Sequence, residues 1–287
     1  MKLNEINIRD PFILPYGGKY YMYGSRGFEA IGFDVYISED LEHWSSPEPV
    51  FEYFDGFWGT KEFWAPEVHV YNGKFYMFAS FNSETTTRGT QVLVADSPTG
   101  PFLEHSREAI TPKDDECLDG TLYIDEKGTP YIIYCQEWIQ IDDGAVCVAE
   151  LSKDLKTRVS EPRVLWKGSA SCKEGEYFQP GKYITDGPFM IKAENELLCL
   201  WSTMIHDTYK EVISRSDNGE IDGNWRVDEN FLYANDGGHG MIFKTFNGDY
   251  KFTYHCPNIQ GKEHPCIKDI RMEELVNNHR YQKERLL

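Results

Sequence analysis

Apolar and polar positions recur along this chain in a pattern that predicts β-hairpins. In the clearest copy, an apolar run at residues 8–13 contains one acidic side chain, Asp10, and a glycine turn then leads into an aromatic run at 18–25. Four further copies begin near residues 65, 118, 185 and 238. Short apolar runs of this kind, separated by Gly, Pro, Asn and Asp, are typical of antiparallel strands. The sequence therefore predicts five related hairpins.

A second motif accompanies the hairpins and supplies a further strand to each. Segments 35–44 and 146–155 alternate apolar and polar residues and end in a turn, and looser copies lie at 91–102 and 211–225. One aligned position of the hairpins is polar in every copy, with spacings of 57, 52, 67 and 53 residues: Asp10, Glu67, Asp119, Asp186 and His239. Such a period is typical of a propeller. We expect an all-β fold, in which residues 1–287 form a single five-bladed β-propeller of four-stranded antiparallel blades.

This aligned position predicts a functional site. The innermost strand of each blade lines the central axis of a propeller, so the five aligned residues should meet at one mouth of the channel. A carboxyl group near others holds its proton more tightly. Asp186, beside the apolar Phe189, is therefore a candidate general acid, and Asp10 a candidate general base. Two plainer interpretations stay open, because Asp10 can cap its strand or pair with Arg9, and Asp119-Gly120 can be a turn dipeptide.

Aromatic residues near the predicted mouth are candidates for contact with a sugar. Phe63 and Trp64 open the second copy, where an aromatic ring either stacks beneath a sugar or packs between blades. Trp138 enters a loop after the second strand of the third blade, and such loops commonly carry ligand contacts.

Four polar residues complete the predicted site. Glu67 is expected to orient its neighbours, His206 lies in a later loop, and Arg271, in the last predicted strand, is expected to reach the same mouth. His239 has glycine on both sides and should face water, where it either binds a metal ion or hydrogen-bonds a carboxylate.

Composition and charge limit the partners. The formal net charge of −18 at pH 7 disfavours nucleic acid and acidic membrane lipids and tolerates neutral substrates. The first residues lack the apolar core of a signal peptide, and no stretch approaches the length of a membrane span. Seven cysteines without paired spacing indicate reduced, mostly buried thiols. We therefore expect a cytoplasmic protein with no nucleic-acid or membrane partner.

These motifs together resemble glycoside hydrolase family 43 over essentially the whole chain: Arg9-Asp10-Pro11, Trp64-Ala65-Pro66-Glu67, Asp119, Asp186-Gly187-Pro188 and Gly238-His239-Gly240. The resemblance implies a five-bladed propeller that hydrolyses arabinofuranosides and xylosides with inversion. It implies that Asp10 is the general base, that Asp119 modulates acidity and orientation, and that position 186 holds the general acid. No cofactor is expected to be required, although His239 would help to hold a calcium ion or water in the channel.

One residue departs from the family pattern. The family usually has Glu before Gly-Pro, whereas this chain has Asp186, which is one methylene shorter. Inversion needs two carboxyl groups roughly 6.5–9.5 Å apart with water between them. The shorter side chain therefore makes position 186 the weakest of the three assignments.

The sequence thus predicts an inverting glycoside hydrolase that cleaves α-L-arabinofuranosyl or β-D-xylosyl linkages in plant-derived oligosaccharides or polysaccharides. One alternative is a non-catalytic carbohydrate-binding propeller that has lost full acid function. Another is a related glycoside phosphorylase, which would need basic side chains at the mouth besides Arg9 and Arg271.

Overall fold

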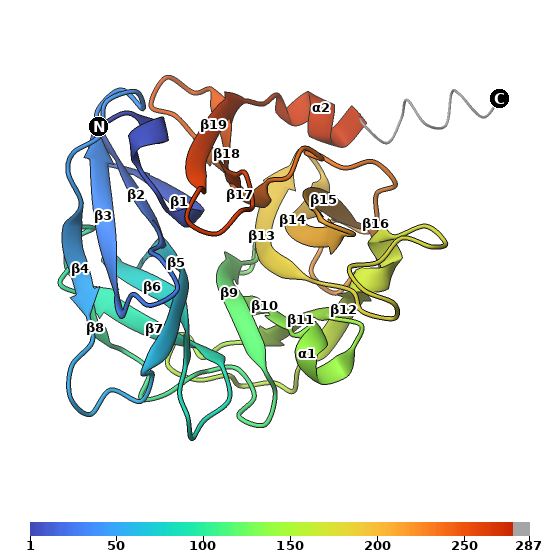
Figure 1. The fold of residues 1–287 in the computed structure, drawn as a ribbon, viewed down its shortest axis with the longest axis horizontal. Coiled ribbons are helices and arrows are strands. Elements are labelled where there is room, and N and C mark those ends of the chain that lie inside the picture. Colours follow the sequence, from blue (N-terminus) through green and yellow to red (C-terminus); the bar gives the residue numbers. More distant parts are fainter. Residues whose placement is uncertain (278–287) are drawn as a thin grey trace.

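Five antiparallel sheets surround a central axis in the computed structural model, which describes residues 1–277 (Figure 1). The first sheet contains β1 (Arg9–Tyr16), β2 (Lys19–Ser25), β3 (Gly32–Ser38) and β4 (Glu48–Glu52). The second contains β5 (Lys61–Tyr71), β6 (Lys74–Asn82), β7 (Gly89–Ala95) and β8 (Leu103–Glu104). The third contains β9 (Cys117–Ile124), β10 (Pro130–Gln136), β11 (Ala145–Glu150) and β12 (Arg163–Lys167).

The last two sheets follow the same order from the axis outwards. The fourth contains β13 (Asp186–Ala193), β14 (Glu196–Ile205), β15 (Thr208–Ser216) and β16 (Trp225–Val227). The fifth contains β17 (Gly238–Lys244), β18 (Tyr250–Cys256) and β19 (His264–Asp269), and is three-stranded within the described residues. The predicted five-bladed propeller is confirmed, and the second motif forms the third strand of each of the first four blades. Residues 278–287 of the predicted domain lie outside the described residues.

The N-terminal segment lies along the last blade and closes the ring. After a short 3-10 helix, η1 (Leu3–Glu5), the main-chain oxygen of Ile6 lies 2.7 Å from the ring nitrogen Nδ1 of His264. The side chain of Asn7 donates to the main-chain oxygen of Glu263 at 2.6 Å. Contacts between segments about 250 residues apart therefore join the first blade to the fifth.

Buried apolar side chains fill the spaces between neighbouring blades. Four clusters of them follow the ring, and the largest packs the first blade against the second and the fifth. All seven cysteines are free thiols, and four are buried: Cys117, Cys135, Cys147 and Cys199. No helix among residues 1–277 is long and apolar enough to span a membrane.

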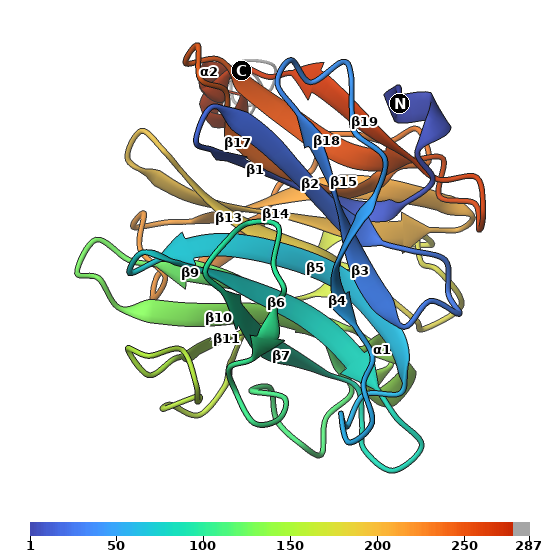
Figure 2. The same ribbon diagram turned by 90° about the vertical axis from the view of Figure 1, so that its left-hand side faces the viewer.

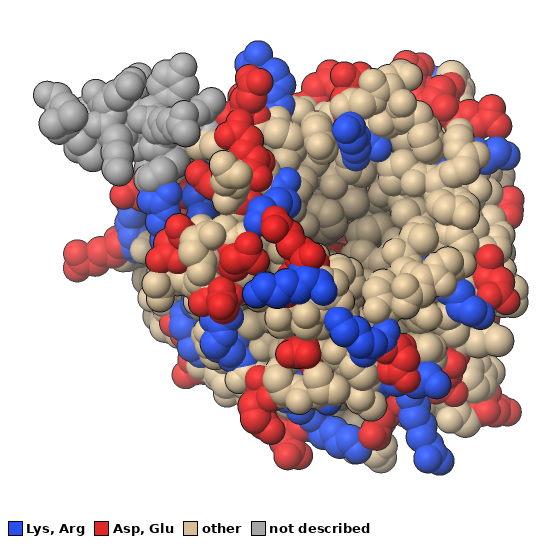
Figure 3. Space-filling model, turned by 180° about the vertical axis from the view of Figure 1, so that it is seen from behind, with Lys and Arg blue, Asp and Glu red and all other residues tan. Residues whose placement is uncertain are grey.

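The two α-helices of the described residues lie toward opposite faces of the ring. Figure 2 shows α1 (Trp138–Ile141) toward one end of the channel and α2 (Met272–Asn277) toward the other. Seen from behind, the face opposite to that of Figure 1 has a central hollow with mostly uncharged walls, and charged side chains surround it (Figure 3).

Candidate active site

Each inner strand starts with an irregular step that turns one residue toward the channel. The residue at this step has a positive φ in all five blades: Asp10 (54°), Ala65 (47°), Asp119 (56°), Gly187 (51°) and His239 (52°). Pairing between the first and second strands is interrupted at the same place in every sheet. A positive φ is unfavourable for residues other than glycine, and such strain tends to cluster at functional sites.

The main-chain amide of each of these five residues donates a hydrogen bond to a side chain of the preceding blade of the ring. The amide of Ala65 donates to Oγ of Ser25 at 2.7 Å, and the amide of Asp119 donates to Oγ of Ser80 at 2.8 Å. His239 uses Ser202 in the same way at 2.7 Å.

The two remaining blades vary this scheme. The amide of Asp10 donates to Nδ1 of His255 at 3.2 Å. The amide of Gly187 donates to Oδ2 of Asp119 at 3.0 Å. These bonds fix the five inner strands relative to one another at one end of the channel.

This register corrects the sequence alignment in two blades. The equivalent of Asp10 is Ala65 in the second blade and Gly187 in the fourth, whereas Glu67 and Asp186 were predicted. Asp186 instead pairs with Ser202, as Arg9 pairs with Ser25, so it sits one residue earlier than Asp10 does in its own blade. The polar residues of the alignment do not, therefore, occupy a single structural position.

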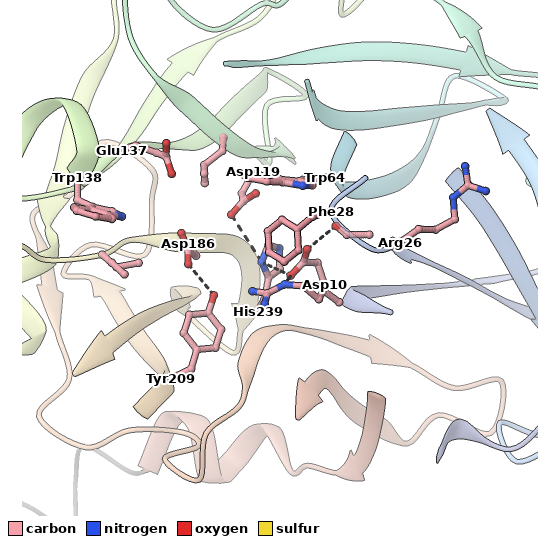
Figure 4. A pocket seen from close by; sticks show the side chains of 14 residues that line it. Asp10, Arg26, Phe28, Trp64, Asp119, Glu137, Trp138, Asp186, Tyr209 and His239 are labelled. Atoms are coloured by element: carbon pink, nitrogen blue, oxygen red, sulfur yellow. Dashed lines mark hydrogen bonds and ion pairs between the residues drawn. The ribbon is translucent and has the colours of Figure 1, made fainter. Parts of the chain in front are cut away.

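The start of the inner strands nevertheless opens into one pocket of about 330 Å³. Its lining residues are Arg9, Asp10, Ser25, Arg26, Phe28, Trp64, Leu118, Asp119, Glu137, Trp138, Ile184, Asp186, Tyr209 and His239. Figure 4 shows Asp10, Asp119 and Asp186 around this space, with Trp64, Phe28 and Trp138 among its walls. The structure thus brings together the three predicted catalytic carboxyls, although they are up to 176 residues apart in the sequence.

His239 lies between two of these carboxyls. Its Nδ1 is 3.1 Å from Oδ1 of Asp10 and 3.8 Å from Oδ2 of Asp119 (Figure 4). Gly187 makes room for the ring, because a Cβ at that position would come within 2.6 Å of it. Ser25 donates to the other oxygen of Asp10, Oδ2, at 2.6 Å. Both oxygens of Asp10 therefore have fixed partners.

The electrostatics differ among the three carboxyls. Burial would raise the pKa of Asp10, but His239 and Arg9 hold it well below its usual range. Burial, helped by the charges of Asp186 and Asp10, raises the pKa of Asp119 to about 7. Burial also raises the pKa of Asp186. Asp10 is therefore ionised at neutral pH and suited to a base, whereas Asp119 and Asp186 retain protons more readily.

His239 is the cation that balances this cluster. Burial would lower its pKa, but Asp10 and Asp119 outweigh burial and raise it to about 10. A protonated imidazole has no lone pair for a metal, and no three His, Cys, Asp or Glu side chains within residues 1–277 gather to hold one. Calcium prefers six to eight oxygen ligands. The protein side chains here fit a protein-ligated calcium poorly, so calcium in the channel stays a prediction that water would have to support.

Four predicted contact residues do not line the pocket. Phe63 is 1% exposed and packs in the core between the first two blades. Glu67 lies further along β5, outside the pocket lining, where it accepts hydrogen bonds from Thr121 and His69 and so orients its neighbours. His206 is exposed in the β14–β15 turn.

Arg271 is also misplaced by the prediction. It lies in front of α2, is mostly exposed and pairs with Glu274. Arg271 is absent from the lining of the pocket, which includes Trp138. Figure 2 shows α2, which Arg271 directly precedes, toward the face opposite to α1.

Several lining residues were missed by the sequence reasoning. Arg26 and Phe28 follow β2, Glu137 directly precedes the predicted Trp138, and Tyr209 belongs to β15. The hydroxyl of Tyr209 donates to Oδ2 of Asp186 at 3.0 Å. Only Glu137 had a sequence signal, its place beside an aromatic loop residue; the others come from strand ends and loops that carry no repeat pattern.

Comparison with known proteins agrees with this geometry. The model of the family described as "Glycosyl hydrolases family 43" matches residues 4–275. The chain belongs to glycoside hydrolase family 43. Glycosidases of this family hydrolyse with inversion, so the predicted enzyme class is confirmed.

Three similar proteins have names that state an enzymatic activity. The crystal structure of endo-arabinase from Bacteroides thetaiotaomicron has 37% identity and a TM-score of 0.88, covering 94% of this chain and 96% of that one. The extracellular endo-α-(1→5)-L-arabinanase 1 of Bacillus subtilis is 26% identical, over 86% of this chain and 75% of its own length. The extracellular exo-α-(1→5)-L-arabinofuranosidase ArbA of Cellvibrio japonicus is 22% identical, over 84% and 72%.

Proposed function

We propose that this family 43 enzyme cleaves α-L-arabinofuranosyl linkages in arabinose-containing oligosaccharides or polysaccharides, with β-D-xylosyl linkages as the second candidate. The observation that carries the proposal is the pocket in which Asp10, Asp119 and Asp186 surround His239. The arabinan-acting names of the three relatives support arabinose over xylose.

The pocket has properties suited to a small neutral sugar. Its volume of about 330 Å³ lies at the small end of the range for ligand pockets, roughly 300–1,000 Å³. Trp64, Phe28 and Trp138 supply aromatic surfaces on which the C–H face of a sugar ring can stack. The carboxyls beside them are placed to accept hydrogen bonds from hydroxyl groups.

In the proposed reaction Asp10 removes a proton from a water molecule as the water attacks the anomeric carbon. Asp10 suits this role because it is ionised and oriented by Ser25 and His239. Asp119, which donates its main-chain N–H to Ser80 and accepts from Gly187, tunes the proton affinity of the carboxyls around it. A carboxylic acid in the pocket then protonates the leaving oxygen, a role that the family pattern gives to Asp186.

Phosphorolysis is less favoured by the same geometry. Arg9 and Arg26 line the pocket, but Arg9 pairs with Glu263, and Arg26 pairs with Asp34 and Glu52. Their charges are therefore already matched by carboxylates, and the predicted contribution of Arg271 is absent from the mouth. Turnover should accordingly not depend on inorganic phosphate.

The central test is the variant Asp10→Ala. Aryl α-L-arabinofuranoside, aryl β-D-xyloside and linear arabino- and xylo-oligosaccharides are assayed with wild type and variant, and product anomers are followed by NMR. We expect kcat to fall by about 10²–10⁴-fold, because the base is removed. Undiminished turnover by Asp10→Ala would refute the assigned mechanism. Binding of oligosaccharide in calorimetry without any turnover by the wild type would instead indicate a carbohydrate-binding propeller.

A further inference from the structure

The pocket contains a fourth carboxyl for which the family pattern has no role. Glu137 is the last residue before α1, its side chain is about nine-tenths buried, and it lines the same pocket as Asp10 and Asp186. Figure 4 shows Glu137 beside Trp138, on the wall above Asp186. Two side chains, Glu137 and Asp186, can therefore compete to protonate a leaving group.

The polar neighbours of Asp186 work against burial, which raises its pKa. Tyr209 donates its hydroxyl proton to Oδ2 of Asp186 at 3.0 Å. Burial, the largest cause, and the charge of Asp10 raise the pKa of Asp186, whereas the positive charges of His239 and Arg9 act with Tyr209 to stabilise the carboxylate. Asp186 is, in addition, one methylene shorter than the glutamate of the family pattern. Asp186 thus combines a shorter reach with a hydrogen bond from Tyr209 and two cations that weaken the effect of burial.

The surroundings of Glu137 are dominated by negative charge. Among residues 1–277 its one ion-pair partner is Arg88, which donates through Nη1 to Oε2 of Glu137. Arg88 also donates to Glu62 through Nε, at 2.8 Å, and through Nη2. One guanidinium is therefore shared between two carboxyls.

Further carboxyls face Glu137 from the other sides. Asp186 on β13, Asp119 on β9 and Glu116 just before β9 all oppose its ionisation. Burial, the largest cause, acts in the same direction, and together they raise the pKa of Glu137 to about 8. No described residue hydrogen-bonds to the other oxygen of Glu137, Oε1, which leaves that atom available to carry a proton.

We propose that Glu137 is the general acid of this enzyme, and that Asp186, held by Tyr209, is a substrate-orienting carboxylate. The O–H proton of Glu137 passes to the glycosidic oxygen as the bond from that oxygen to the anomeric carbon breaks. Water, losing a proton to Asp10, forms the new bond to that carbon, and exchange with solvent returns the proton from Asp10 to Glu137. This inference rests on the proposed hydrolysis of pentosides.

The test compares two leaving groups. Linear α-1,5-arabinotriose needs protonation of its leaving oxygen, whereas 2,4-dinitrophenyl α-L-arabinofuranoside releases an anion that is already stable. For Glu137→Gln we expect about 10²–10⁴-fold loss of kcat with arabinotriose, and less than tenfold loss with the aryl glycoside. In the wild type, kcat/KM for arabinotriose should fall at high pH as the general acid loses its proton. This basic limb should disappear in Glu137→Gln.

Matched variants separate an acid from a structural ion pair. Glu62→Gln also removes a carboxylate partner of Arg88, but Glu62 does not line the pocket. This variant should therefore change kcat by similar factors for both substrates. Asp186→Asn should likewise slow both substrates by similar factors, and Asp186→Glu, which restores the family pattern, should give no gain with arabinotriose.

Three outcomes would overturn the proposal. The first is equal loss with both substrates in Glu137→Gln while circular dichroism shows a folded protein. The second is a loss confined to arabinotriose in Asp186→Asn. The third is a wild type that hydrolyses neither arabinoside, which would remove the proposed function itself and is recognised by the absence of wild-type turnover.

Discussion

The pocket contains a cation of its own, the buried imidazole of His239, which lies beside two of the carboxyls. Its Nδ1 faces Asp10 and Asp119, and the two carboxyls keep the ring protonated across the neutral range. A cation fixed by packing needs no binding equilibrium. The two carboxyls beside it differ in protonation: the pKa of Asp10 is lowered, chiefly by His239, whereas burial raises the pKa of Asp119 to about 7.

The variant His239→Gln tests this role. The pKa of Asp10 is depressed in the folded protein, chiefly because His239 outweighs burial, so removing the positive charge lets burial raise it. Because the base must be ionised, the acid limb of the kcat/KM profile should move to higher pH, by roughly 1–3 pH units. His43→Gln, on the exposed outer surface of the first blade, is the control and should leave that limb in place. An unmoved limb in His239→Gln would show that the imidazole does not set the charge of Asp10.

At the scale of the element, strand alternation decides which aromatic residue serves the site. Phe63 and Trp64 are neighbours on β5, so their side chains leave opposite faces of the strand. Phe63 packs against Phe33, Phe51 and Phe81, while Trp64 lines the pocket beneath the guanidinium of Arg88, which lies 4.7 Å from its ring.

Replacing Trp64 should therefore affect substrate binding, whereas replacing Phe63 should affect stability. Trp64→Ala should raise KM by roughly three- to tenfold, because a stacking contact worth about 0.5–1.5 kcal/mol is lost, and should leave the melting temperature nearly unchanged. Phe63→Ala should lower the free energy of unfolding by about 3–5 kcal/mol. Steady-state kinetics and urea denaturation of both variants check this, and a KM effect in the folded Phe63→Ala protein would contradict it.

The repeated hairpins and the irregular starts of the inner strands explain how much of the site the sequence could predict. Hairpins repeated along the chain were sufficient for five blades, and Asp10, Asp119 and His239 occupy equivalent places as the repeat implied. The irregular step at the start of each strand adds a residue that no apolar pattern reveals, so Glu67 and Asp186 were aligned wrongly. Tyr209 and Phe28 approach the pocket from a third strand and a loop, and only the folded ring brings them there.

At the scale of the whole molecule, the site makes stability depend on pH. Burial raises the pKa of Asp119 and Glu211 to about 7 and of Glu137 to about 8, and neighbouring carboxylates raise that of His239 to about 10. In this pH range the folded state thus binds more protons than the unfolded chain. The stability from these groups is present at low pH and is lost as pH rises through the folded pKa values. His255 acts in the opposite sense, because burial lowers its pKa to about 3.

We therefore expect the melting temperature to fall by several degrees between pH 6.5 and pH 9 at constant ionic strength. Glu211→Gln gives a matched comparison, because Glu211 is buried, receives hydrogen bonds from Ser202 and Gly240, and lies outside the pocket. The wild type should gain stability relative to this variant as pH falls from 7 to 5, and calorimetry would measure both curves. Parallel curves for the two proteins would contradict the assignment of a proton to Glu211.

The bonds that fasten the channel-facing amides have a consequence for how such a protein can change. Ser25, Ser80 and Ser202 each hold the blade that follows, and His255 of the last blade holds Asp10 of the first. Insertion or deletion of a blade would change which blades these side chains join and would alter the separation of the catalytic acid and base. The geometry of the active site therefore depends on the closed ring of five blades.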